Sequence, residues 1–195
     1  MPLIFLDTET TNFPKKYGEL KQSGQARVCQ IAMLLTDDEG NSLAEYSSLI
    51  KPDGWQIEAK AAEVHGFTNE KCEQYGVSAI GVYTFFYRMA KIADKIIAHN
   101  IEFDRKMMEI EAAYVGHPSA NKPWFCTMEA SSPILNLSPT EKMVAAGFNK
   151  PKVPKLEEAL QFLCGRGLGN TAHDAMYDVK ACRDIYFELK KRGVA

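Results

Sequence analysis

The stretch Leu3-Ile4-Phe5-Leu6-Asp7-Thr8-Glu9-Thr10-Thr11 opens the chain with an apolar run that passes into alternating acidic residues and threonines. A short apolar run bounded by polar residues is typical of a buried strand, which we expect over Leu3–Asp7. Because side chains in a strand alternate between two faces, Asp7 and Glu9 should point to the same side. A carboxylate near the edge of a core needs a partner or a metal ion. The stretch therefore predicts two acidic groups gathered at the end of a buried strand.

The segments that follow favour a mixed sheet covered by helices. Two apolar runs, Val28–Leu35 and Ala44–Ile50, flank the turn-forming residues 37–41 and should form an antiparallel hairpin. Beyond them, strands and helices alternate, which is typical of an α/β fold. We expect strands at 95–99 and 124–126, short helices between 58 and 75 broken at Gly66, and longer helices at 79–93, 102–115, 155–164 and 174–192. Residues 131–154 contain four prolines and are expected to be loop-like, with a helical turn or two between 140 and 146.

Length and composition predict one globular domain over residues 1–195. Hydrophobic residues make up 46% of the chain and charged residues 25%, which are ordinary values for a globular protein. The formal net charge of −2 does not by itself indicate a nucleic-acid partner. Carboxylates that bind metal ions count as negative in this total, so the objection to such a partner is weak.

Several features predict a cytoplasmic protein. No apolar run approaches the roughly 20 residues of a membrane span, and the first residues lack the pattern of a signal peptide. The five cysteines are odd in number and form no C-x-x-C pair, so we expect free thiols. Free thiols are typical of a reducing compartment.

Two later segments carry further acidic residues and a histidine. Asp104 lies five residues after His99, where a short strand gives way to a helix, and is a candidate site residue. The alternative is an acid that is favoured in the first turn of the helix by the helix dipole. His173 and Asp178 are five residues apart, which in one continuous helix would point them about 140° apart. They converge only if His173 precedes the helix, which Asp174 as N-cap would permit. The alternative for Asp178 is a solvated helix face.

Taken together, these segments resemble the three motifs of the DEDDh family of 3′→5′ exonucleases. Phe5–Thr11 follows F-x-D-x-E-T-T, Ala98–Asp104 follows A-H-N-x-x-F-D, and His173 with Asp178 follows H-x-x-x-x-D. A smaller likeness is Val64–Thr68, which resembles the H-G-[IF]-T turn of the family.

The resemblance extends from residue 3 to about residue 190. The segment Trp124–Met128 is more similar to stand-alone or phage-type and prophage-type exonucleases than to polymerase-bound proofreading subunits.

The resemblance implies a ribonuclease-H-like α/β fold with a five-stranded mixed sheet flanked by helices. It implies two divalent metal ions, Mg²⁺ or Mn²⁺, bound by four carboxylates: Asp7, Glu9, Asp104 and Asp178. It also implies that His173 acts as general base. The positions that match contacts to the terminal nucleotide in relatives are Thr10, Val64, His65 and Phe103. Core packing is an alternative for Phe103, and a turn role is an alternative for His65.

The implied activity is the release of nucleoside 5′-monophosphates from a single-stranded 3′ end, with DNA as the expected nucleic acid. Three alternatives stay open: an exoribonuclease that trims RNA, a proofreading subunit bound to a polymerase, and a non-catalytic nucleic-acid-binding module. A polymerase partner is not indicated, since no long tail follows Ala195, and the oligomeric state stays unspecified. Lysines in the loop 12–25 either meet phosphates or are solvated.

Overall fold

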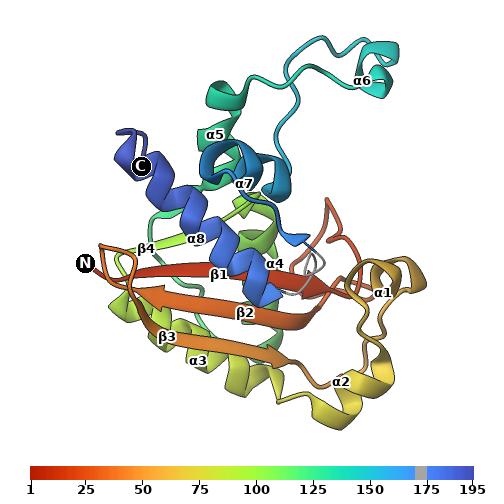
Figure 1. Ribbon diagram of the computed structural model, residues 1–195. Helices are drawn as coiled ribbons and strands as arrows, with labels where there is room; N and C mark the ends of the chain where they lie inside the picture. Colours follow the sequence, from red (N-terminus) through yellow and green to blue (C-terminus); the bar gives the residue numbers. More distant parts are fainter. Residues whose placement is uncertain (170–174) are drawn as a thin grey trace.

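Five strands form one mixed sheet in the order β3-β2-β1-β4-β5 (Figure 1). This computed structural model describes residues 1–169 and 175–195. The strands are β1 Leu3–Thr10, β2 Val28–Thr36, β3 Ser42–Leu49, β4 Lys95–Ala98 and β5 Trp124–Cys126. The pairs β1–β2 and β2–β3 are antiparallel, whereas β1–β4 and β4–β5 are parallel. The expected five-stranded mixed sheet is therefore confirmed.

Helices cover both faces of the sheet. Their bounds are α1 Ala59–His65, α2 Asn69–Tyr75, α3 Ala79–Ile92, α4 Ile101–Val115, α5 Thr127–Leu135, α6 Glu141–Ala145, α7 Leu156–Cys164 and α8 Ala175–Lys191. Helix α8 crosses one face of the sheet, and α3 and α4 lie on the other (Figure 1). Within the described part of the chain, no helix combines the length and apolarity that a membrane span requires.

The odd-numbered and even-numbered residues of strand β1 pack into two different hydrophobic clusters. Leu3 and Phe5 pack in the cluster that includes residues of α8. Ile4 and Leu6 pack in the other cluster, with residues of α3 and α4. Because alternate side chains of a strand point to opposite faces, the odd-numbered residues of β1 face α8 and the even-numbered ones face α4. This parity decides where the polar residues at the end of the strand point.

Strand β1 continues to Thr10, three residues beyond the expected end at Asp7. The extension is stabilised by pairing with the antiparallel strand β2, since Glu9 pairs with Gln30 and Thr10 with Val28. On its other side, β1 loses its partner earlier: the last pair with β4 is Phe5 with Ile97. The end of β1 therefore lies open on the β4 side, where the turn into α4 follows.

The loop-like assignment of residues 131–154 is wrong for its first part. Helix α5 runs from Thr127 to Leu135 and contains Pro133. Tertiary packing outweighs the proline here: Leu135 lies in a buried cluster with residues of α7 and α8. The hydroxyl of Ser132 also donates to the carbonyl of Met128 at 2.7 Å. A proline in the sequence signals a helix break, but it does not report the neighbours that hold the helix together.

Residues 136–155, which we call the arm, connect α5 to α7. The arm leaves the body of the molecule and carries α6 at its far end (Figure 1). The short helix α6 contains no buried residue, and Thr140 caps its first turn by accepting a hydrogen bond from the backbone N–H of Met143. The expected helical turn between 140 and 146 is confirmed by α6.

Candidate active site

Three acidic side chains meet where the end of β1 faces α8. Asp7 and Glu9 are odd-numbered residues of β1, so both point toward that helix. Asp178 lies in the first turn of α8, on the stripe that also carries the buried Ala175 and Cys182. One carboxylate oxygen from each of Asp7, Glu9 and Asp178 lies within 4.8 Å of the others. The structure thus brings together acidic groups separated by about 170 residues of sequence.

Asp104 approaches the same region from α4. It lies in the first turn of that helix and is 3% exposed. The hydroxyl of Thr8, an even-numbered residue of β1, donates to its carboxylate at 2.8 Å. Asp104 is not part of the close group of three, yet its charge raises the pKa of both Asp7 and Glu9. Its position beside the unpaired edge of β1 fits a shared acidic site.

Burial and mutual repulsion make this group unfavourable as four bare anions. Burial, followed by the charges of Asp104, Glu9 and Asp178, raises the pKa of Asp7 well above its usual value. Burial, then the charges of Asp178 and Asp104, raises the pKa of Glu9 to about 7. Burial raises the pKa of Asp104 to about 7 against the opposing hydrogen bond from Thr8. Converging carboxylates with raised pKa values fit a site for a hard divalent cation, which takes oxygen ligands.

The turn between β4 and α4 is held by contacts that the sequence motif did not predict. Asn100 adopts a left-handed backbone conformation with φ of 71°. Burial lowers the pKa of His99 to about 4, so its ring is neutral. We assign the proton to Nε2, which lies 3.1 Å from the carbonyl of Pro154, and Nδ1 then accepts from the hydroxyl of Thr127 at 3.0 Å. His99 therefore joins the segment that leads to Asp104 with α5 and the arm.

A cavity of about 300 Å³ lies beside Glu9. Its lining includes all four positions expected to contact a terminal nucleotide: Thr10, Val64, His65 and Phe103. The structure places these residues together from three separate elements, β1, α1 and α4. Its volume is at the lower end of the roughly 300–1,000 Å³ found for ligand pockets.

His65 shapes this cavity by joining α1 to the end of β1. The backbone N–H of Phe67 donates to its Nδ1 at 3.1 Å, so the ring proton belongs on Nε2. Nε2 lies 3.3 Å from the carbonyl oxygen of Thr10. The ring is 8% exposed and stacks on Phe67. His65 therefore stabilises the turn after α1, as the alternative for this residue proposed, and it also lines the cavity.

Two aromatic rings form the outer part of the cavity. Phe103 is partly buried against the core, and the ring of Phe13 meets it edge-on at a centroid distance of 6.1 Å. Phe13 is 80% exposed. Sequence reasoning missed Phe13, although it is an aromatic residue in the polar segment that follows the first motif. It also missed Asn12 and Glu58, which hydrogen-bond to each other in the cavity wall.

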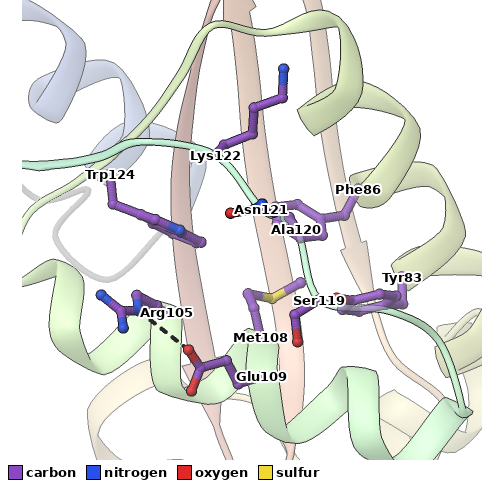
Figure 2. Close-up of a pocket in the computed structure, with 10 residues that line it drawn as sticks. All are labelled: Tyr83, Phe86, Arg105, Met108, Glu109, Ser119, Ala120, Asn121, Lys122 and Trp124. Atoms are coloured by element: carbon purple, nitrogen blue, oxygen red, sulfur yellow. Dashed lines mark hydrogen bonds and ion pairs between the residues drawn. The ribbon is translucent and has the colours of Figure 1, made fainter.

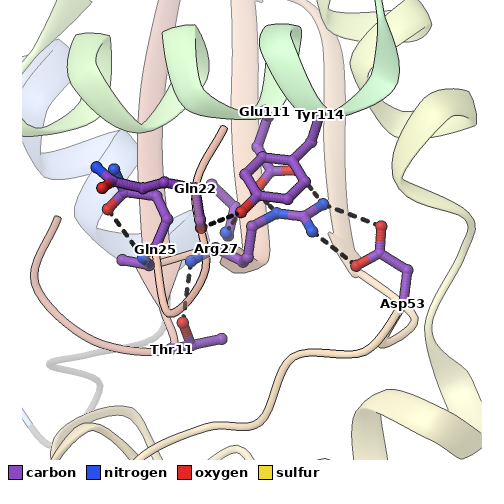
Figure 3. A network of polar contacts seen from close by, with 9 residues as sticks. Thr11, Gln22, Gln25, Arg27, Asp53, Glu111 and Tyr114 are labelled. Carbon is purple, nitrogen blue, oxygen red and sulfur yellow. Dashed lines mark hydrogen bonds and ion pairs between the residues drawn. The ribbon is translucent and has the colours of Figure 1, made fainter. Parts of the chain in front are cut away.

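A buried ion network holds the loop after β1 against α4 (Figure 3). The guanidinium of Arg27 binds Glu111 through two nitrogens at 2.8 and 2.9 Å and binds Asp53 at 2.7 and 3.2 Å. It also lies 4.0 Å from the ring centre of Tyr114. The hydroxyl of Tyr114 donates to the carbonyl of Gln22 at 2.7 Å. The loop that carries Phe13 is therefore fixed from its far end.

His173 and Asp174 lie outside the described residues, so the expected placement of the histidine before α8 and of its N-cap stays a prediction.

The model of one protein family, RNase_T, described as exonuclease, matches residues 4–186. The chain belongs to this exonuclease family. It is thus an enzyme of the DEDDh 3′→5′ exonuclease class, whose members typically use divalent metal ions. The expected recognition and reaction class are confirmed, while the roles of individual residues stay predictions.

Solved structures of E. coli exonuclease I share the fold of this exonuclease. The complex with a dA16 oligonucleotide has a TM-score of 0.75 and 19% identity over 98% of this chain and 41% of that one. The complex with a dT13 oligonucleotide gives 0.77, and the zinc-bound complex with single-stranded DNA gives 0.75, at the same identity and coverage. This likeness confirms the ribonuclease-H-like fold.

The chain spans about 41% of the length of those structures. A comparison with curated proteins found no match.

Proposed function

We propose that this exonuclease hydrolyses the terminal phosphodiester at the 3′ end of single-stranded DNA and releases a nucleoside 5′-monophosphate. The observation that carries the proposal is the close group of Asp7, Glu9 and Asp178 oxygens beside a cavity of about 300 Å³. The acidic group suits the scissile phosphate with its metal ions, and the adjacent cavity suits the last nucleotide. Complexes of E. coli exonuclease I with single-stranded oligonucleotides support this choice of substrate.

Four carboxylates, Asp7, Glu9, Asp104 and Asp178, would hold two divalent ions, and oxygen ligands favour Mg²⁺ or Mn²⁺. When bound, such ions acidify the attacking water and stabilise charge on the phosphate and the leaving oxygen. Asp104 would keep its position through the hydrogen bond from Thr8.

The chain's own residues would orient the strand and move the proton. His173 would take the proton of the attacking water, since an imidazole with a pKa near 6.5 suits a base at neutral pH. The hydroxyl of Thr10 already donates to the carbonyl of Asn12 at 2.9 Å, so its oxygen would accept a hydrogen bond from the terminal 3′ hydroxyl. Phe103, with Phe13 against it, would offer its ring to the terminal base.

All five cysteines are free thiols, which supports a reducing compartment such as the cytoplasm.

The test is the release of mononucleotides from labelled single-stranded DNA, duplex DNA and RNA of one sequence, with Mg²⁺ or with chelator. We expect single-stranded DNA to be degraded fastest, and only with the metal. The variant Asp7→Asn should remain folded by circular dichroism and lose hydrolysis. Faster degradation of RNA would replace the DNA proposal by the exoribonuclease alternative, and full turnover in chelator would refute the metal-dependent mechanism.

A further inference from the structure

The arm, residues 136–155, concentrates positive charge in a chain that is otherwise acidic. It holds four lysines, at positions 142, 150, 152 and 155, against the single acidic Glu141, a formal charge of +3. The whole chain has a formal charge of −2. A basic segment of this kind attracts a polyanion.

The arm also exposes large apolar side chains. Val144 is 51% exposed, Phe148 64% and Val153 54%. Helix α6 contributes no buried residue to the fold. Along the arm these exposed apolar side chains alternate with lysines. Phe148 supplies an aromatic face among the lysines, and an aromatic face beside cations is the combination that binds single-stranded nucleic acid.

The base of the arm is fixed to the body, so the arm is not a loose tail. The backbone N–H of Lys152 donates to the carbonyl of Leu137 at 3.1 Å and closes the arm at its foot. The ammonium of Lys152 binds the Glu158 carboxylate at 2.7 Å. The carbonyl of Pro154 accepts from His99, which lies five residues before Asp104. The arm therefore stands on the segment that carries one of the acidic residues of the site.

Another surface with cationic and aromatic residues, the cavity beside Trp124, suits a phosphate less well (Figure 2). There the guanidinium of Arg105 binds Glu109 at 3.2 Å. The ammonium of Lys122 donates to the carbonyls of Lys91 and Ala93, at 3.1 and 2.6 Å. Both cations of this cavity are thus engaged within the protein, whereas Lys142 and Lys150 of the arm are exposed.

We propose that the arm binds the substrate strand on the 5′ side of the nucleotide being removed. Lys142 and Lys150 contact its phosphates, and Phe148 offers a ring to one of its bases. The inference rests on the proposed function, because it takes the strand held by the arm to be the one cleaved at the carboxylates. Substrates too short to reach the arm should gain no affinity from it.

The test compares Lys142→Ala/Lys150→Ala and Phe148→Ala with the wild type. The matched control is Lys51→Ala/Lys191→Ala, which removes two exposed lysines outside the arm. The first readout is the affinity for a fluorescent single-stranded oligonucleotide of about 20 nucleotides, measured by anisotropy in EDTA. We expect the arm lysine variant to bind about tenfold more weakly at low salt, with a smaller salt dependence. We expect Phe148→Ala to bind severalfold more weakly and to keep the salt dependence.

The second readout is hydrolysis of a dinucleotide and of the long oligonucleotide with Mg²⁺. Arm variants should cleave the dinucleotide at the wild-type rate and degrade the long strand more slowly at limiting concentration. If the proposed function is wrong, the wild type cleaves neither substrate, which is a different result from a failure of the arm.

Three outcomes would overturn the inference about the arm. One is oligonucleotide affinity in the arm variants equal to that of the wild type and the control. Another is an equal loss of cleavage on the dinucleotide and the long strand, which would mean that the substitutions damage the site itself. The third is a changed sedimentation coefficient in Phe148→Ala with unchanged oligonucleotide binding, which would identify the arm as a protein interface.

Discussion

Because the clustered carboxylates of the site have raised pKa values, we expect the metal-free protein to lose stability as the pH rises from 5 to 8. The pKa values of Glu9 and Asp104 lie near 7 in the folded protein, against ordinary values of 4.5 and 3.8. The folded state therefore holds protons that the unfolded chain has already released. A group with a raised folded pKa stabilises fully below its unfolded pKa, and this contribution is lost as the pH rises through the folded value. Metal-free stability should thus fall between pH 5 and 8.

The size of the effect follows from the shift at Glu9. Its pKa rises from 4.5 to about 7. At 1.36 kcal/mol for each pKa unit, the loss from this group is at most about 3 kcal/mol. For a chain of this length, a change of that size lowers the melting temperature by roughly 6–12 °C. A divalent cation at the proposed metal site would bind the carboxylates in their ionised form, so saturating Mg²⁺ should remove most of the decrease.

The assay is thermal unfolding followed by tryptophan fluorescence at pH 5, 6, 7 and 8, in EDTA and in Mg²⁺. Asp7→Asn is the matched variant, because it removes one of the repelling charges and one proposed metal ligand with little change in side-chain volume. In EDTA at pH 8 it should be more stable than the wild type, and Mg²⁺ should stabilise it less. Melting temperatures of the wild type in EDTA that stay level or rise from pH 5 to 8 would refute the reasoning.

Three further predictions concern the cavity, the ion network and the proposed general base. Phe103→Ala should raise KM for a single-stranded oligonucleotide about tenfold or more through loss of stacking, as steady-state kinetics would show; an unchanged KM would indicate that Phe103 only packs in the core. Arg27→Met should lower the free energy of unfolding in urea by about 3–5 kcal/mol, since it leaves Glu111 buried with a charge. Arg27→Met/Glu111→Leu should lose less, and equal losses would contradict this electrostatic account. His173→Ala should reduce kcat at least about 100-fold while leaving the melting temperature in EDTA within about 2 °C; a rate near that of the wild type would exclude His173 as the base.

The sequence by itself predicted the elements whose residues carry their own periodicity. Helix α4 and strand β2 begin and end within one residue of their expected bounds, because their apolar patterns are regular and their ends are marked by polar residues or glycine. Asp7, Glu9, Asp104 and Asp178 were also predicted from the sequence, through the resemblance of their motifs to those of the exonuclease family. The first kind of feature depends only on local sequence, and the second depends on resemblance to other sequences. Neither requires knowledge of tertiary contacts.

Contacts across the chain decided the rest. Thr8 takes no part in the expected site, yet it holds Asp104, because an even-numbered residue of β1 faces α4. Phe13 enters the cavity wall by meeting the ring of Phe103, 90 residues away, and the sequence does not show that pairing. Pro133 lies inside a helix that packing against α7 and α8 keeps intact.

The convergence of Asp7 and Glu9 with Asp178 is likewise a tertiary result. The free energy that drives it comes from burying the apolar face of α8 on the sheet, among residues such as Phe5 and Val179. The acidic side chains are brought within 4.8 Å of one another at a cost in electrostatic repulsion. A sequence names the groups that can bind a cation, but only the packing of distant apolar surfaces supplies the energy that holds these groups together.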